Sequence, residues 1–314
     1  MLKKLVSIVC CGLLAVVTGC SANQSKDSKS EVVIQALNKD KQVTEITVPS
    51  NPEKIAVLDM ALLDIVDSLG VGDRIVAVPK TSVDYLKKYS EDEKVVNAGT
   101  VKEVDMEALM EAQPEVIFIG GRLSSQYEAL EKIAPVVYLT NDYEKGLVNS
   151  VKNNVSVIAS IFGKETEAKK LTDAFDSRIA KIAKASKGKT AVVGLVTSSS
   201  FNTLGNDSRG SLIGMEAGFE NIATDVDSTH GNESSFELLV EKNPDYIFVI
   251  DRDSAISKEG AQLAKDVMDN ELVQQTKAYK NNHIVYLTST VWYLAEGGIT
   301  AMDLMLKDIE QVIL

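Results

Sequence analysis

Two arginines each follow a run of strand-forming residues. The segment VIFIGGR ends at Arg122, and the segment YIFVIDR ends at Arg252. A guanidinium group stays charged at any physiological pH and donates hydrogen bonds in a planar fork, so it is suited to binding an oxygen anion. Each arginine could instead pair with a nearby acid such as Asp251, or extend into solvent. Because the arrangement occurs twice, we predict that both arginines face an anionic ligand.

Three further side chains with binding chemistry lie near the ends of predicted elements. Arg209 stands in GNDSRGSLIG before a predicted helix, whose N-terminus also favours an anion. His230 stands in the polar loop DSTHGNESSFE, and Tyr293 stands in STVWYLAEGG after a predicted strand. A lone loop histidine is usually a surface residue, and Trp292-Tyr293 alone would more often belong to a core. Their shared position past strand ends makes all three candidates for the same site.

The two arginines belong to an internal repeat. Residues 105–122 and 235–252 are identical at seven of eighteen positions, at a constant offset of 130. Each copy has the pattern of a short amphipathic helix, a proline that ends it, and a buried parallel strand. A second pair, VVYLT at 136–140 and IVYLT at 284–288, follows in the same order. We therefore predict two lobes of related plan.

Alternating strands and helices indicate the fold class. Apolar runs predict eight strands, which begin at Lys54, Arg74, Val95, Val116, Val136, Thr190, Tyr246 and Ile284. With helices between them, these strands predict an α/β protein of two Rossmann-like lobes with mostly parallel sheets. Ligands in such sheets bind beyond the carboxyl ends of the strands, so the site is expected in a cleft between the lobes.

One long helix is expected to join the lobes. Apolar residues recur every three or four positions between glycines at 163 and 188. The predicted boundaries are 32–163 for the N-terminal lobe, 164–187 for the linking helix and 188–314 for the C-terminal lobe. A rigid linking helix predicts limited closure of the cleft on ligand binding.

The N-terminus has the pattern of an exported lipoprotein. Two lysines precede an almost wholly apolar run of thirteen residues, which is too short to span a bilayer, and small residues then lead to Cys20. Residues 1–19 are predicted to be a signal peptide, Cys20 to carry lipid, and 20–31 to be a flexible tether to the cell membrane. The alternative is an ordinary secretory signal followed by an incidental cysteine.

The acidic composition excludes one class of partner. The net charge of −12 at pH 7 argues against binding to nucleic acid and against electrostatic adhesion to anionic lipid. It leaves room for a local basic pocket that binds a small anion.

The motifs around the candidate residues resemble those of one protein family, the substrate-binding lipoproteins of bacterial iron–siderophore ABC importers. The motifs that carry the resemblance are GGR at Arg122, NDSRG at Arg209, THGNES at His230, IDR at Arg252 and STVWYL at Tyr293. The likeness covers nearly everything after the tether and is strongest to the subgroup that binds catecholate siderophores, such as enterobactin fragments and petrobactin. It implies that the three arginines bind a ferric catecholate siderophore, while His230 and Tyr293 ligate its Fe³⁺. Some relatives carry a lysine where this chain has Ser125, so we expect a different pocket charge.

The resemblance also implies a partner, the permease dimer of an ABC transporter. Glu107 and Glu237 occupy the same position in the two copies of the repeat. Their simplest role is to stabilise the N-termini of their helices. Relatives of this type use one glutamate per lobe against arginines of the permease. We therefore expect Glu107 and Glu237 to dock a permease of two identical subunits, with the binding protein itself a monomer.

Two other functions stay open at this level. One is a receptor for haem, cobalamin or another metal chelate. Haem could use Tyr293 and His230 as axial ligands, but three arginines are more than two propionates need. The other is a siderophore-processing enzyme, although the chain has no GxSxG, HExxH, P-loop or GxGxxG motif. We expect a binding protein that is not an enzyme, has no intrinsic cofactor and transports a ferric siderophore.

Overall fold

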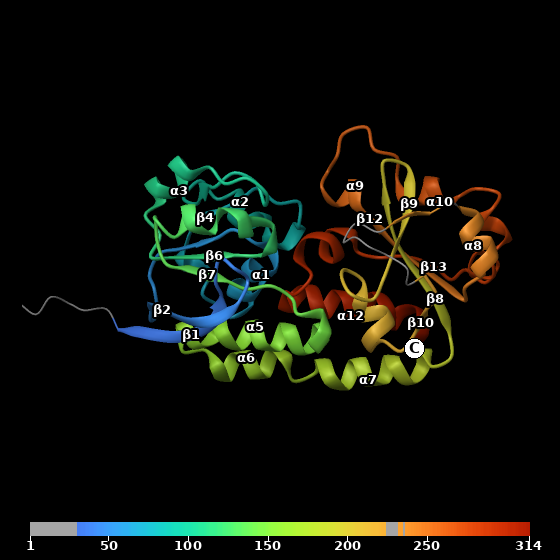
Figure 1. Ribbon diagram of the computed structural model, residues 1–314, viewed down its shortest axis with the longest axis horizontal. Coiled ribbons are helices and arrows are strands. Elements are labelled where there is room, and N and C mark those ends of the chain that lie inside the picture. The colour runs from blue at the N-terminus through green and yellow to red at the C-terminus, as the bar shows by residue number, and fades with distance from the viewer. Residues whose placement is uncertain (1–29, 224–231, 235) are drawn as a thin grey trace, which may run out of the picture.

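The computed structural model describes residues 30–223, 232–234 and 236–314, and it describes the side chains of all of these except 232–234. Two α/β lobes lie side by side, and helices run beneath both of them (Figure 1). This arrangement confirms the predicted two-lobed α/β fold with mostly parallel sheets. The predicted signal peptide, Cys20 and His230 lie outside the described residues.

The N-terminal lobe is built on a seven-stranded sheet in the order β2-β1-β7-β6-β3-β4-β5. Strands β3 to β7 are the five predicted strands, and they run parallel to one another. The strands of this lobe are β1 (Glu31–Leu37), β2 (Val43–Pro49), β3 (Ile55–Val57), β4 (Ile75–Val78), β5 (Val96–Asn97), β6 (Val116–Ile119) and β7 (Val136–Tyr138). Its helices are α1 (Met60–Ser68), α2 (Lys87–Ser90), α3 (Met106–Ala112), α4 (Tyr127–Leu130) and α5 (Leu147–Phe162).

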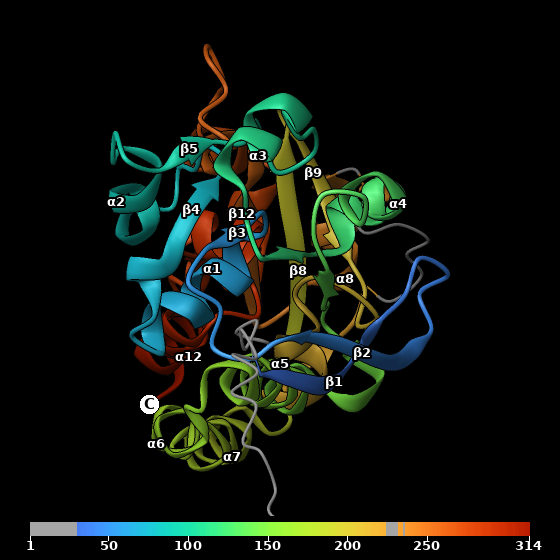
Figure 2. The same cartoon turned by 90° about the vertical axis from the view of Figure 1, so that its left-hand side faces the viewer.

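The hairpin of β1 and β2 was not predicted from the sequence. Strand β1 pairs antiparallel with β2 along its whole length and with β7 at its end. Its residues alternate between exposed and more buried positions, as expected of a strand with one face in solvent. The predicted strands were continuous apolar runs, and this segment is not one. Figure 2 views the molecule from the side of this lobe and shows the hairpin beside α5, against which β1 packs.

The C-terminal lobe contains a second sheet in the order β11-β9-β8-β12-β13, with β10 also pairing with β8. The predicted strands β8, β12 and β13 run parallel. The unpredicted β9 returns antiparallel to β8 through Ser198 and Ser199, whose φ angles of 48° and 66° make a two-residue turn that suits the twist of a hairpin.

The bounds of the elements of this lobe complete the description. Its strands are β8 (Thr190–Thr197), β9 (Ser200–Leu204), β10 (Glu220–Asn221), β11 (Asn232–Ser234), β12 (Tyr246–Asp251) and β13 (Ile284–Tyr286). Its helices are α8 (Phe236–Lys242), α9 (Arg252–Ala255), α10 (Ala264–Met268), α11 (Lys277–Lys280) and α12 (Ile299–Ile313).

The internal repeat has the same structure in both lobes. Helices α3 and α8 each end one residue before a left-handed position, Gln113 with φ 49° and Asn243 with φ 44°. A proline follows at once in each copy and prevents the helix from continuing. Strands β6 and β12 come next and lie inside their sheets, with neighbours on both sides. Each repeat therefore delivers its arginine to the carboxyl end of an internal strand.

The linking segment consists of two helices and not the single helix predicted over 164–187. Helix α6 (Glu165–Thr172) and helix α7 (Phe175–Ser186) are separated by Asp173 and Ala174, which keep right-handed helical dihedral angles. The Thr172 hydroxyl donates to the carbonyl of Ala168 at 3.0 Å, and this kind of back-bonding bends helices. In Figure 1, α6 runs below α5, and α7 runs below the C-terminal lobe.

The two halves of the chain cap each other's helices. Asp64 on α1 accepts hydrogen bonds from the Thr300 N–H at 3.0 Å and the Ala301 N–H at 2.8 Å, in the first turn of α12. Glu216, in the π-helical turn η5 (Leu212–Glu216), accepts from the first two N–H groups of α5 at 2.6 and 3.2 Å. The first N–H groups of a helix have no partner within it, so each carboxylate satisfies donors of the other lobe.

Candidate functional site

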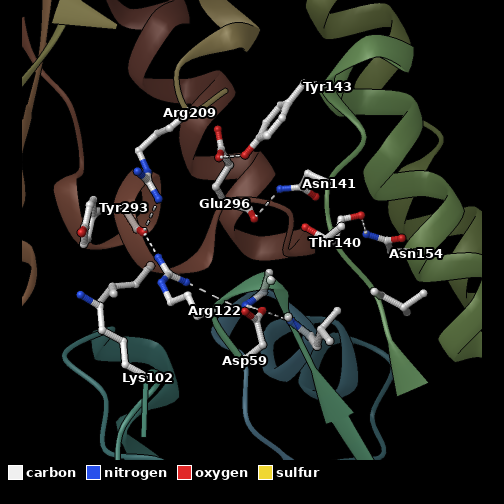
Figure 3. Close-up of a pocket in the computed structure, with 16 residues that line it drawn as sticks. Asp59, Lys102, Arg122, Thr140, Asn141, Tyr143, Asn154, Arg209, Tyr293 and Glu296 are labelled. Carbon is white, nitrogen blue, oxygen red and sulfur yellow. Dashed lines mark hydrogen bonds and ion pairs between the residues drawn. The ribbon is translucent and has the colours of Figure 1, made fainter. Parts of the chain in front are cut away.

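Four of the predicted binding residues meet between the lobes. Tyr293 lies in the π-helical turn η7 (Val291–Ala295), and guanidinium groups surround its ring. The guanidinium carbons lie 5.8, 4.4 and 5.7 Å from the ring centroid, and they belong to Arg122, Arg209 and Arg252. Figure 3 shows two of these arginines reaching toward Tyr293. The structure therefore brings these four residues together around one ring.

Arg122 crosses from the N-terminal lobe to the C-terminal lobe. It lies in the turn η3 (Gly121–Gln126) that follows β6, and its Nη2 donates to the Tyr293 backbone carbonyl at 2.7 Å. Its Nη1 lies 4.0 Å from Oδ2 of Asp59. Asp59 also accepts the N–H groups of Ala61 and Leu62 as the N-cap of α1. Burial raises the pKa of the Asp59 carboxyl, while Arg122 and the two N–H groups oppose that rise.

Arg252 is held by a buried acid. Its Nε donates to the Tyr293 phenol oxygen at 3.0 Å, and its Nη1 donates to Asp253 Oδ1 at 2.9 Å. The Lys258 ammonium lies 3.0 Å from the other carboxylate oxygen of Asp253. The group of Arg252, Asp253 and Lys258 therefore keeps one net positive charge. Burial favours the neutral acid, but the Ser198 N–H and Lys258 outweigh it and hold the pKa of Asp253 below its usual value.

A cavity of about 370 Å³ lies beside Tyr293. Arg122, Arg209 and Tyr293 contribute to its wall, whereas Arg252 contacts Tyr293 without lining it. The lining also contains seven polar residues that sequence reasoning missed, which are Asp59, Lys102, Thr140, Asn141, Tyr143, Asn154 and Glu296. The cavity thus combines cationic and anionic side chains with neutral hydrogen-bonding groups.

Lys102 brings a further cation to this cavity. It is exposed, and its backbone carbonyl accepts a hydrogen bond from the Gln126 side chain at 3.0 Å. Ser125, which stands where some relatives carry a lysine, is exposed and does not line the cavity. Lys102 follows β5 by five residues, so the rule that selected Arg122 could also have found it. It was missed because β5 has only two residues, so the sequence does not mark clearly where this strand ends.

Glu296 joins the two lobes at the wall of the cavity. The Tyr143 hydroxyl donates to Glu296 Oε2 at 2.7 Å, and the Asn141 amide donates to the Glu296 backbone carbonyl at 2.9 Å. Burial raises the pKa of the Glu296 carboxyl, and Arg209 and the Tyr143 hydroxyl counteract it. Burial and the neighbouring Glu296 likewise raise the pKa of Tyr143, so its hydroxyl remains a hydrogen-bond donor.

Trp292 points away from the site although Tyr293 is its neighbour in the chain. Its side chain is fully buried, and its indole N–H donates to Asp308 Oδ2 of α12 at 2.9 Å. It therefore belongs to the core beneath the cleft.

The remaining predicted residues lie away from the cavity or outside the described part of the chain. Glu107 and Glu237 are exposed in the first turns of α3 and α8, one on each lobe. His230 and Cys20 are outside the described residues, so no geometry is assigned to them. Across residues 30–223, 232–234 and 236–314, no cluster of three or more His, Cys, Asp or Glu side chains could hold a metal ion. In the same part of the chain, no helix combines the length and the apolar character needed to cross a membrane.

This chain resembles known binding proteins both in sequence and in structure. Residues 55–291 match the family model described as periplasmic binding protein. The chain is 35% identical to the petrobactin-binding protein YclQ of Bacillus subtilis, over 98% of both chains. The crystal structure of YclQ superposes with a TM-score of 0.84 at 34% identity, over 91% of this chain and 99% of that one. The periplasmic catecholate-siderophore binding protein VctP of Vibrio cholerae superposes with a TM-score of 0.82 at 29% identity, over 90% of this chain and all of that one.

Proposed function

This chain belongs to the periplasmic binding protein family, and from that premise we propose that it binds a ferric catecholate siderophore outside the cytoplasm and delivers it to an ABC importer. Two of its relatives are named for petrobactin and for catecholate siderophores. The relatives found are binding proteins, which agrees with a role in capture and not in catalysis.

The observation that carries this proposal is the group of three guanidinium groups around one tyrosine ring. Ferric catecholates are anionic, flat and aromatic. A guanidinium group can donate two hydrogen bonds to neighbouring catechol oxygens and can also stack on a catechol ring. Lys102 adds a third cation to the lining of the cavity beside Tyr293, together with Arg122 and Arg209. A net positive group of side chains in a chain of net charge −12 is difficult to explain without an anionic ligand.

We assign Tyr293 and His230 as direct ligands of the transported iron. Fe³⁺ is a hard ion that favours phenolate oxygen, and imidazole is an acceptable second ligand. A tetradentate bis-catecholate leaves two of six coordination positions open, which these two side chains would fill. Arg252 donates to the Tyr293 oxygen at 3.0 Å and so holds that oxygen in a defined direction.

The delivery step depends on two further assignments. Cys20 would carry the lipid anchor that keeps the protein at the extracytoplasmic face of the cell membrane. Glu107 and Glu237, at equivalent positions of the internal repeat, would dock a permease dimer, with one monomeric binding protein per transporter.

A titration of intrinsic fluorescence tests the proposal. The ligands are ferric bis-catecholate and tris-catecholate complexes, their iron-free forms, haem and cobalamin. Trp292 is buried and bonded to Asp308, so ligands will quench its emission by energy transfer and not by contact. Saturable binding of the ferric catecholates alone is expected, with no turnover of ligand. Preference for haem or cobalamin would overturn the assignment.

A further inference from the structure

The segment that carries Tyr293 is held from the opposite lobe. Three side chains of the N-terminal lobe donate to residues 293–296 of the C-terminal lobe. Arg122 donates to the Tyr293 carbonyl at 2.7 Å and Asn141 to the Glu296 carbonyl at 2.9 Å. Tyr143 donates to the Glu296 carboxylate at 2.7 Å. Figure 3 shows Asn141 and Tyr143 pointing toward Glu296.

This segment has an irregular backbone. Tyr293 lies in a π-helical turn, and such turns are rare and occur mainly at functional sites. Glu296 leaves helical geometry with ψ 116°, and Gly297 follows with φ 111°. Buried carbonyl groups in such a turn need partners from outside it. The hydrogen bonds from Arg122 and Asn141 supply them.

Gly297 allows the close approach of Asn141. A Cβ atom at this position would lie 2.6 Å from Oδ1 of Asn141 and 2.9 Å from its Nδ2. Such distances are far below a van der Waals contact. The amide of Asn141 is therefore packed against the bend that ends the Tyr293 turn, and it is not a loose surface contact.

Glu296 also links Tyr143 to Arg209 through the charge of its carboxylate. Tyr143 fixes the carboxylate of Glu296, and this carboxylate is close enough to Arg209 to interact with its charge. The guanidinium carbon of Arg209 lies 4.4 Å from the centroid of the Tyr293 ring. Moving the Glu296 carboxylate would thus change the position of the cation that lies over this ring.

We propose that Asn141 and Tyr143 are positioning residues for Tyr293, acting through Glu296 across the gap between the lobes. This inference rests on the proposed function, because it concerns the side chain assigned as an iron ligand. Both residues stand just after β7, so they belong to the N-terminal lobe, while Tyr293 belongs to the other. The direction of the phenol oxygen then depends on how the two lobes are placed relative to each other.

The test uses Tyr143→Phe, which removes one hydroxyl and keeps the ring. Its matched control is Tyr89→Phe, since Tyr89 is another tyrosine of this lobe whose hydroxyl donates to a carboxylate, that of Asp67 on α1. With a ferric bis-catecholate, Tyr143→Phe is expected to weaken binding about tenfold and to reduce the phenolate charge-transfer band. Binding of a hexadentate ferric tris-catecholate should stay within about twofold of wild type, because its iron has no open position. Tyr89→Phe should leave both affinities and the band unchanged.

A ligand-free measurement separates this inference from the proposed function. In protein with ¹³C-labelled tyrosine, the Tyr293 resonance is identified by its loss in Tyr293→Phe. It should shift in Tyr143→Phe and in Asn141→Leu, and stay in place in Tyr89→Phe. An unmoved Tyr293 resonance, or equal losses of affinity for both ligands, would overturn the positioning role. A wild-type protein that binds neither ferric catecholate would overturn the proposed function, while the resonance would still decide the positioning.

Discussion

The Nε of Arg252 donates to the phenol oxygen of Tyr293 at 3.0 Å. The two residues come from different elements of the C-terminal lobe, the start of α9 and the turn η7. The hydrogen bond fixes the oxygen at the end of a ring that three guanidinium groups surround. Tyr293, which is only 4% exposed, therefore has a phenol oxygen with a defined direction.

Tyr293→Phe removes that oxygen and keeps the ring. We expect a ferric bis-catecholate to bind about tenfold more weakly or worse, with loss of the phenolate contribution to its colour. A hexadentate tris-catecholate should bind almost as before. Absorption spectra and fluorescence titrations of both complexes measure this difference. Equal losses for the two ligands would show that Tyr293 packs or hydrogen-bonds without ligating iron.

Arg209→Ala should weaken binding of either ferric catecholate by about 2–4 kcal/mol, because the ligand anion would be left partly desolvated. Arg209→Lys should recover only part of this, since the planar fork is lost. Isothermal titration calorimetry gives both values.

Arg178→Ala is the control for Arg209→Ala. Arg178 is a part-buried arginine that pairs with Glu310 at 2.8 Å on α12 and is absent from the cavity lining. It should lower the melting temperature and leave the affinity unchanged. An affinity loss as large as that of Arg209→Ala would mean that general loss of charge, and not the pocket, sets binding.

Asp253→Asn should destabilise the protein by about 1–3 kcal/mol at pH 7, because Arg252 and Lys258 lose a buried counter-ion. The pKa of Asp253 is lowered in the folded protein, so its stabilising effect is present above the unfolded value of about 3.9. That effect disappears as the pH falls through the lower folded pKa. The gap in melting temperature between wild type and variant should therefore be constant near neutrality and close below about pH 4. Asp303→Asn, at a side chain 60% exposed, should change the melting temperature little at neutral pH.

The double variant Glu107→Gln and Glu237→Gln tests the docking assignment. Glutamine keeps much of the shape of each side chain and removes its charge, so siderophore affinity and melting temperature should stay near wild type. Uptake through the reconstituted transporter should fall sharply. Normal uptake would leave both glutamates as helix-stabilising residues without a role in docking.

The sequence predicted the features that leave a local or repeated pattern. The repeat around Pro114 and Pro244 predicted two internal strands. The arginine after each strand lies near Tyr293, but only Arg122 lines the cavity, while Arg252 is paired with Asp253. Continuous apolar runs predicted β8 and β12. They did not predict β1, because its residues alternate between exposed and more buried positions. The interruption between α6 and α7 was missed because Asp173 and Ala174 keep helical dihedral angles and leave the apolar pattern regular.

Contacts between distant segments left no such pattern. Asn141 and Tyr143 reach Glu296 across more than 150 positions of sequence, and neither has a spacing that suggests it. The sequence also does not show in which direction Trp292 points. Its neighbour faces the cleft while its own indole is bonded to Asp308 in the core, because a helical turn sends adjacent side chains in different directions.

The exchange of caps between the lobes has a consequence for how the protein folds. Helix α12 depends on Asp64 for its first N–H groups, and α5 depends on Glu216, so neither half of the chain contains all the partners of its own helices. Each half made alone would therefore contain one helix whose first N–H groups lack their capping carboxylate. The two lobes should unfold in one cooperative transition, and separately expressed halves should become ordered only when they are mixed.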